Sequence, residues 1–388
     1  MSKKTTIAII AAALIGAFAA WTARGVYDIY VHSGLYSKLS GIQNVLDSKF
    51  LYPYDEEKAA DIAALAITAS LEDPYTIYYN KKQFSDYKNL SKGDFIGIGV
   101  TVVWDKEKDE ILVTSVMENS PGEKAGIMVG DMIVAVDGTT YTGSQMTEAV
   151  SKIKGTYLEG SVENTPVTVT IKRGTKNSDL TIIRERIHED TVSCSMIEDK
   201  TGYIKISAFN NTLSQKDPST DKEFEKAIAE LTEKGMEKLI IDLRDNGGGD
   251  LQVVSRIIDS IVPEGIIMYY EDKFGNRTEM KSDKEEMTLP IAVLVNGNSA
   301  SASELMTGAL RDYKKATVIG EKTYGKGVMQ HVLGFSDGSG MTVTVAKYYT
   351  PLGTCVEGTG ITPDITVSNS GEADTQLKTA IDYLKERK

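Results

Sequence analysis

The chain has few of the side chains on which many kinds of site depend. Its 388 residues include only 2 cysteines and 3 histidines. His32, His188 and His331 are dispersed and lack the spacing of metal ligands, so we predict no metal site and no bound cofactor. The spacing of Cys194 and Cys355 leaves both a disulfide and two free thiols open.

Positive charge is also scarce relative to negative charge. The chain has 43 lysines and arginines against 55 aspartates and glutamates, a net charge of −12, and no dense basic run. A nucleic-acid partner requires a basic face that binds phosphates. The composition therefore argues against nucleic-acid binding. The length and the apolar fraction of 41% instead suit a globular protein of two or three domains.

One strongly apolar stretch stands out at the N-terminus. Two lysines precede the almost uncharged residues 5–23, which is the layout of a signal peptide or a single membrane anchor. Trp21 suits an interfacial position beyond an uncleaved helix, whereas the Ala-Phe-Ala sequence at 17–19 suits a cleavage site. We predict an anchor in residues 1–30 that holds the rest of the chain outside the cytoplasm at the cell membrane. Secretion after cleavage is the alternative.

The period of the apolar residues divides the remaining chain into three regions. Residues 31–91 have apolar residues three and four apart, which predicts helices. Residues 92–184 alternate short strands with glycine and proline turns, which predicts a β-rich module. Residues 185–388 alternate buried strands with amphipathic helices and end in a C-terminal helix. The predicted fold is a multidomain α/β (α+β) protein with a layered α/β core and an inserted β-rich module.

The first candidate for chemistry is "IIDLRDNGGGDL", residues 240–251. A buried strand runs into three glycines and then a helix. Such a junction leaves backbone amides unpaired and suited to an anion or a developing oxyanion. A single glycine would indicate only a turn that needs positive φ, but three in a row favour a functional role. A P-loop is excluded because no Gly-Lys-Ser/Thr follows.

The second candidate is the serine-rich junction "VNGNSASASEL". Ser299 and Ser303 suit helix caps, and each serine taken alone is more easily explained by capping or exposure than by catalysis. Downstream, "GEKTYGKGVMQ" places Lys326 between two glycines with Gln330 four residues on. Serine and lysine form a known nucleophile–base pair, which requires a lysine that is neutral because it is buried or near other cations. The residues alone do not choose among the three serines.

A histidine-based triad is the alternative to a lysine base. It would use His331 with Asp242 or Asp245. If the residues after Lys326 form a strand, His331 points away from the face that carries the lysine. This alternation favours the lysine.

Taken together, these motifs resemble the carboxyl-terminal processing proteases, which are tail-specific S41-type serine peptidases with a Ser–Lys dyad. "GYIKISAF", "IIDLRDNGGGDL", "NGNSASASEL", "GEKTYGKGVMQ" and "YYTPLGTCVEGTGITPDI" occur in the order of that family. The resemblance implies Ser301 as nucleophile, Lys326 as base and Gln330 as the residue that orients the lysine. It also implies an oxyanion hole made of backbone amides: those of Ala302 and of Gly247 or Gly248.

The β-rich module resembles a PDZ domain. "FIGIGV" matches the carboxylate-binding loop, and "SPGEKAGIMVGDMIVAVDG" follows downstream. The resemblance implies that a substrate tail adds as a strand while backbone amides hold its terminal carboxylate. The residues assigned to this site are Phe95, Ile96, Gly97, Ile98 and Gly99.

The predicted function is a serine endopeptidase that recognises the C-terminal tails of protein substrates through the PDZ domain. Hydrolysis would proceed through an acyl-enzyme. The rival is a PDZ-bearing binding or scaffold protein whose hydrolase fold is inactive. The complete set of Ser301, Lys326 and Gln330 favours the enzyme. Expected partners are proteins or peptides with a free C-terminus, a second copy of the chain and a regulatory protein.

Overall fold

The computed structural model describes residues 33–90, 94–155, 163–188, 190–211, 218–283, 285–369 and 373–387. The membrane anchor predicted for residues 1–30 lies outside these ranges. Within the described ranges, no helix combines the length and hydropathy that a membrane span requires. The chain divides into two compact units between residues 63 and 64.

The N-terminal region is helical but interrupted by one strand. Its elements are α2 (Ser33–Lys49), α3 (Glu56–Ala69), β1 (Ile77–Tyr79) and α4 (Lys81–Leu90). The sequence predicted helices throughout this region, whereas β1 pairs antiparallel with β18 (Gly340–Tyr349). A β-branched residue followed by two tyrosines suits a strand once a partner edge is present. The three- and four-residue spacing of apolar residues in the surrounding helices gives no signal for so short a strand.

The β-rich module is built around an antiparallel sheet. Its elements are β2 (Asp94–Gly97), β3 (Val100–Asp105), β4 (Glu110–Val116), α5 (Pro121–Lys124), β5 (Met132–Val136), β6 (Thr139–Thr140), a 3-10 turn (Gly143–Gln145), α6 (Met146–Lys154), β7 (Pro166–Arg173), β8 (Lys176–Ile183) and β9 (Glu185–His188). The strand order is β3-β4-β5-β7-β8, and β2 pairs with β9. Alternate residues of its strands, such as Ile111 and Val113 of β4, are buried in one core. Strand β3 lies at the edge of the sheet.

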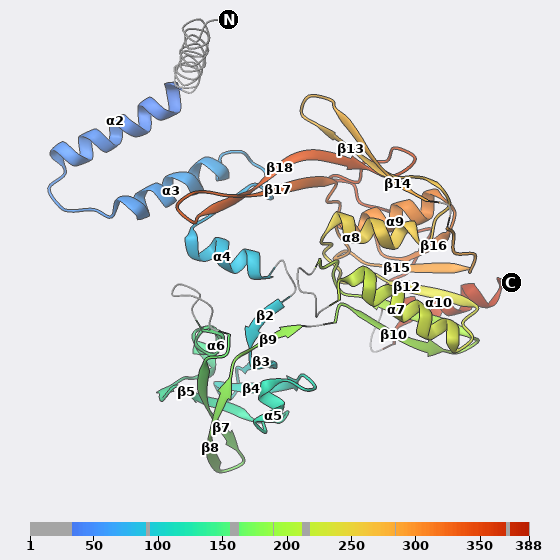
Figure 1. The fold of residues 1–388 in the computed structure, drawn as a ribbon, viewed down its shortest axis with the longest axis horizontal. Coiled ribbons are helices and arrows are strands. Elements are labelled where there is room, and N and C mark those ends of the chain that lie inside the picture. Colours follow the sequence, from blue (N-terminus) through green and yellow to red (C-terminus); the bar gives the residue numbers. More distant parts are fainter. Residues whose placement is uncertain are drawn as a thin grey trace, which may run out of the picture. The chain divides into compact units, whose positions relative to one another are not determined.

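The C-terminal core is a layered α/β domain. Its elements are β10 (Val192–Ile197), β11 (Thr201–Ile206), α7 (Thr220–Glu233), β12 (Lys238–Asp242), α8 (Leu251–Asp259), β13 (Gly265–Asp272), β14 (Arg277–Ser282), β15 (Ile291–Val295), α9 (Ala302–Asp312), β16 (Ala316–Gly320), β17 (Val328–Gly334), β18, β19 (Ile365–Thr366) and α10 (Thr375–Lys385). The main sheet has the order β10-β11-β12-β15-β16-β19, and all its pairings except β10 with β11 are parallel (Figure 1). The predicted fold class is confirmed.

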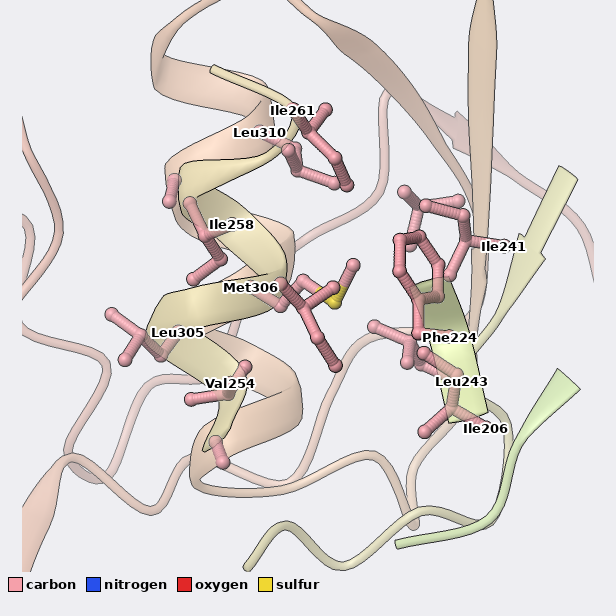
Figure 2. Packing of buried hydrophobic residues seen from close by; sticks show 14 of the residues in the cluster. Ile206, Phe224, Ile241, Leu243, Val254, Ile258, Ile261, Leu305, Met306 and Leu310 are labelled. Carbon is pink, nitrogen blue, oxygen red and sulfur yellow. The ribbon is translucent and has the colours of Figure 1, made fainter. Parts of the chain in front are cut away.

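Successive side chains of the central strand β12 point to opposite faces of this sheet. Leu239 and Ile241 lie in the larger core with helices α7, α8 and α9, whereas Ile240 lies in the smaller core with α10. Figure 2 shows Leu305 and Met306 of α9 in the larger core. Both side chains are fully buried, so the start of α9 is fixed firmly against the sheet.

A second sheet completes the core domain. Its strand order is β1-β18-β13-β14, and β17 also pairs with β18. Strands β17 and β18 carry two residues that bear on the candidate site, Gln330 and Tyr348.

Candidate active site

The parallel sheet brings the predicted site residues to one edge. The glycine run follows β12, the serine turn follows β15, and the loop that carries Lys326 follows β16. These three strands are parallel neighbours, so the loops after their carboxyl ends meet on the same side of the sheet. The two motifs that the sequence singled out are therefore brought together by topology.

Two of the three serines fasten the serine turn to the glycine loop. The hydroxyl of Ser299 donates to the carbonyl oxygen of Leu243 (2.8 Å), and that of Ser303 donates to the carbonyl oxygen of Asn246 (2.9 Å). Both serines are fully buried. The sequence suggested that they cap the helix, but Ser301 occupies the N-cap position of α9 and is partly exposed. The structure thus separates Ser301 from its neighbours.

Ser301 has a strained backbone. Its φ of 56° and ψ of −115° lie in a region that residues with a Cβ rarely adopt, at a cost on the order of 1–3 kcal/mol. The next residue, Ala302, begins α9, so its N–H has no acceptor within the helix. The positive end of the helix dipole lies at the same place. A negative charge developing beside Ser301 would therefore meet a favourable field.

The glycine loop packs directly against Ser301. Gly248 has φ +105°, and a Cβ placed on it would lie 2.8 Å from the Cβ of Ser301 and 3.0 Å from the nitrogen of Ala302. Only glycine fits this position. The amide of Gly248 donates to Oδ1 of Asn246 (2.8 Å), whereas within the described part of the chain the exposed Gly247 amide has no acceptor. Of the two amides that the resemblance offers, Gly247 and Gly248, the free one is thus that of Gly247.

Lys326 lies half-buried in the loop between β16 and β17. Its Nζ is 4.7 Å from the centre of the Tyr75 ring. Burial lowers the pKa of Lys326, while the carboxylates of Glu357 and Asp73 act in the opposite direction. The net shift is downward, which is the direction that a lysine base requires.

Gln330 lies on β17 close to the neighbouring strand. Its Nε2 donates to Oγ1 of Thr344 on β18 (3.3 Å). Its role in orienting Lys326 stays a prediction. His331, the next residue, is exposed.

Both aspartates of the alternative triad have other partners. Asp242 is fully buried and accepts hydrogen bonds from the guanidinium of Arg244 and from the hydroxyl of Tyr203 (2.6 Å). Asp245 accepts from the side-chain amides of Asn296 and Asn298 (2.9 and 2.8 Å). The geometry therefore offers no support for a histidine base.

Sequence reasoning missed two buried side chains that contact both motifs. Glu304 accepts a hydrogen bond from the backbone N–H of Ser301 (2.9 Å) and from that of Lys326 (2.8 Å). The spacing of Ser301 and Glu304 is that of a capping box, which is a usable signal. The hydroxyl of Tyr348 contacts the carbonyl oxygens of the same two residues. No sequence pattern predicts the contact of Tyr348.

The PDZ-type loop borders a small groove. Gly97, Ile98 and Gly99 line a cavity of about 40 Å³ together with Val100 and Val102 of β3 and Val150, Ile153 and Lys154 of α6. Ile96 is buried, and the backbone of Phe95 pairs with Ile187 of β9. The groove therefore lies between helix α6 and the outer edge of β3, which pairs with no other strand in the described ranges. This arrangement suits the addition of a peptide strand.

Among the described residues, no group of three His, Cys, Asp or Glu side chains is arranged to hold a metal ion. Cys194 and Cys355 are two separate free cysteines.

The α/β core, with its strained serine beside a glycine loop, and the PDZ-type module each match a known family of domains. Residues 200–367 match Peptidase family S41, and residues 85–172 match the PDZ domain. The chain thus contains an S41 peptidase domain and a PDZ domain, which confirms the family predicted from the motifs.

Curated relatives of similar sequence are named as serine proteases. A Staphylococcus aureus protein named "Probable CtpA-like serine protease" is 36% identical over 335 residues, which is 85% of this chain and 64% of the relative. Its namesake from Staphylococcus saprophyticus is 34% identical over 331 residues, 84% of this chain and 64% of the relative. The chain therefore spans 64% of the length of these relatives.

Solved structures agree on the fold. The photosystem II D1 C-terminal processing protease is 28% identical with a TM-score of 0.50, covering 84% of this chain and 86% of that one. An S41-type structure from Bacteroides fragilis has a TM-score of 0.53 at 15% identity, covering 82% and 88%. The second likeness concerns the fold alone.

Proposed function

We propose that the protein is a serine endopeptidase that binds the C-terminal tail of a protein substrate through its PDZ domain and cuts the chain with a Ser301–Lys326 dyad. The proposal rests on the observation that one side chain binds both the serine turn and the lysine loop. Glu304 accepts a hydrogen bond from the backbone N–H of both dyad residues. The backbones of the nucleophile and of the base, which belong to two different loops, are thus held by one carboxylate.

The chemistry that this geometry supports is acyl transfer. Oγ of Ser301 attacks the carbonyl carbon of the scissile bond, and neutral Nζ of Lys326 takes the hydroxyl proton. The tetrahedral intermediate then collapses, and the lysine returns the proton to the leaving amine. Water attacks the resulting ester with Lys326 again as base, which releases the new carboxyl end and restores Ser301.

Two backbone amides are suited to the negative oxygen of the intermediate. The Ala302 N–H lies at the N-terminus of α9, and the exposed Gly247 N–H belongs to the glycine loop that packs against Ser301. Removing one such donor typically costs about 10²–10³-fold in kcat. The Gly248 amide is a poorer candidate because Asn246 already accepts its hydrogen bond.

Tail recognition is assigned to the groove between β3 and α6. The outer edge of β3 would pair with the substrate tail, and the amides of Gly97, Ile98 and Gly99 would hold its carboxylate. The apolar side chains of Val100 and Ile153 and the small volume of the cavity suit a small apolar last residue. A tail-binding module linked to the peptidase would also couple tail binding to activity.

The test is hydrolysis of an unfolded protein that ends in an apolar tail. We expect wild type to cleave it, and Ser301→Ala and Lys326→Ala to lose cleavage while the fold survives. Ser303→Ala is the matched control, because its hydroxyl only fastens the serine turn. This control is expected to lower the melting temperature and to keep cleavage.

Two other outcomes would redirect the proposal. If Lys326→Ala cleaves and His331→Ala does not, the base is histidine. If wild type is inert yet binds tail peptides, the chain is a PDZ-bearing binding protein. Amidation of the substrate's terminal carboxylate is expected to weaken tail binding, and equal binding of both forms would contradict the role of the Gly97–Gly99 loop.

We also propose that residues 1–30 attach the protein to the membrane with its domains outside the cytoplasm, and that it forms homodimers. Exposed apolar residues on α2, namely Leu35, Tyr36, Leu39, Ile42 and Val45, support association with a second copy. Membrane fractionation with sequencing of the mature N-terminus tests the first statement. Light scattering of the purified chain tests the second, and a monomer at micromolar concentration would contradict it.

A further inference from the structure

Four backbone groups of the candidate dyad converge on two buried side chains. Oε2 of Glu304 accepts the N–H of Ser301 (2.9 Å) and the N–H of Lys326 (2.8 Å). The hydroxyl of Tyr348 lies against the carbonyl oxygen of Ser301 (2.9 Å) and against that of Lys326. Each of the two side chains thus binds one backbone group of the nucleophile residue and one of the base residue.

Both carboxylate oxygens of Glu304 accept hydrogen bonds from these two loops. Its other oxygen, Oε1, accepts from the hydroxyl of Thr323 (2.6 Å) and from the N–H of Gly325 (2.8 Å). All four partners are donors, so both oxygens act only as acceptors. Glu304 has no exposed surface. It therefore joins the start of α9 to residues 323–326 without facing solvent or substrate.

Tyr348 supplies the complementary donor. It lies on β18 and is fully buried. Burial raises the pKa of Tyr348 well above its ordinary value, so the hydroxyl keeps its proton over any working pH. One proton facing two carbonyl oxygens is shared between them. The phenol thereby draws the Ser301 and Lys326 carbonyls toward one point.

These contacts bear on the geometry of reaction rather than on the fold alone. Ser301 has positive φ, and its N–H and its C=O are the two groups that Glu304 and Tyr348 bind. Loss of either contact removes one hydrogen bond from the serine turn and one from the lysine loop. The spacing between Oγ of Ser301 and Nζ of Lys326 then loses part of its restraint.

We propose that Glu304 and Tyr348 are positioning residues that set the spacing of the Ser301–Lys326 dyad. The inference rests on the proposed function, and neither side chain touches the substrate. Both residues lie outside the dyad, and they hold the nucleophile and the base at a fixed distance from each other.

The test compares Tyr348→Phe and Glu304→Gln with wild type. The first removes only the shared donor, and the ring continues to fill the core. The second keeps the shape of the side chain but turns an NH₂ group toward backbone donors. We expect each to lower kcat on the order of 10- to 100-fold, the effect of misplacing a reacting group by up to about 1 Å. KM is expected to stay unchanged, since tail binding does not involve these residues.

Two control variants separate positioning from stability. Tyr349→Phe changes the adjacent tyrosine, whose ring stacks on Tyr269. Glu223→Gln changes another buried glutamate, which accepts from the N–H and hydroxyl of Thr191 (2.7 and 2.8 Å). We expect both to keep wild-type kcat per folded molecule, although Glu223→Gln lowers the melting temperature. Folded fractions are measured by near-ultraviolet circular dichroism in every sample.

The outcomes are decisive. A fall in kcat per folded molecule in Tyr348→Phe and Glu304→Gln, with KM constant and both controls normal, supports the proposal. Wild-type kcat per folded molecule in both, or a loss only as large as that in Glu223→Gln, overturns it while the dyad stands. If wild type neither cleaves nor is labelled on Ser301 by a fluorophosphonate, the proposed function fails and this inference fails with it.

Discussion

Replacing Gly248 with alanine tests whether the glycine loop holds the reactive serine in place. The added methyl group would lie 2.8 Å from the Cβ of Ser301, 2.8 Å from the carbonyl oxygen of Ala300 and 3.0 Å from the nitrogen of Ala302. Two of these three atoms are backbone atoms, which cannot rotate away. The serine turn must therefore shift as a whole.

The size of the shift follows from these contacts. An ordinary contact between carbon atoms is about 3.5 Å, so relief of the 2.8 Å contact needs a movement of about 0.7 Å. Because a misplacement of about 1 Å costs about 10²-fold in rate, we expect kcat to fall about 25-fold. The φ of +105° adds a strain on the order of 1–3 kcal/mol to the folded state.

The assay measures kcat and KM on the tailed substrate together with thermal unfolding. Gly275→Ala is the matched control, because Gly275 also has positive φ (+79°) but a Cβ there meets no atom within 4 Å. It lies in the turn between β13 and β14, and we expect it to lose stability without losing kcat. If Gly248→Ala folds and keeps wild-type kcat, Ser301 is not held by the glycine loop and the reasoning is refuted.

Further predictions concern charge. Burial lowers the pKa of Lys326 while Glu357 and, to a smaller extent, Asp73 raise it. Glu357→Gln is therefore expected to lower this pKa and to move the acid limb of the pH profile of kcat/KM to lower pH, because the neutral lysine is the active form. Asp73→Asn is expected to move the limb in the same direction by less, and an unmoved limb in both variants would mean that Lys326 does not govern it. Arg244→Leu leaves the fully buried Asp242 without its guanidinium partner and is expected to lower the free energy of unfolding by about 3–5 kcal/mol; a loss below about 1 kcal/mol in urea denaturation would contradict this.

The elements of the core were predictable because their patterns are long and regular. Apolar runs such as "LII" within "KLIID" and "IAVLV" became the parallel strands β12 and β15, as burial on both faces requires. The strand β1 was not predictable. It has three residues and exists because β18 offers an edge to pair with, a partner more than 250 residues away in the sequence.

The choice among the three serines is a second feature that the local sequence did not predict. Each sits in the same Ser-Ala repeat, so local sequence treats them alike. In the structure the hydroxyls of Ser299 and Ser303 bind carbonyls of the loop after β12, and only Ser301 has positive φ. That distinction depends on a neighbouring strand and cannot be computed from residues near the serines.

The sequence by itself determined the layered α/β core, the β-rich module and the candidate residues, because apolar period, glycine runs and motif order are local properties of the chain. Tertiary structure alone decided how the candidates meet. It placed Tyr75 beside Lys326 and directed Glu304 and Tyr348 to the backbones of both Ser301 and Lys326. The contacts made by Lys326 join segments that lie 22 to 251 residues apart, counted as 326 − 304 and 326 − 75. Packing, rather than local propensity, sets distances over such separations.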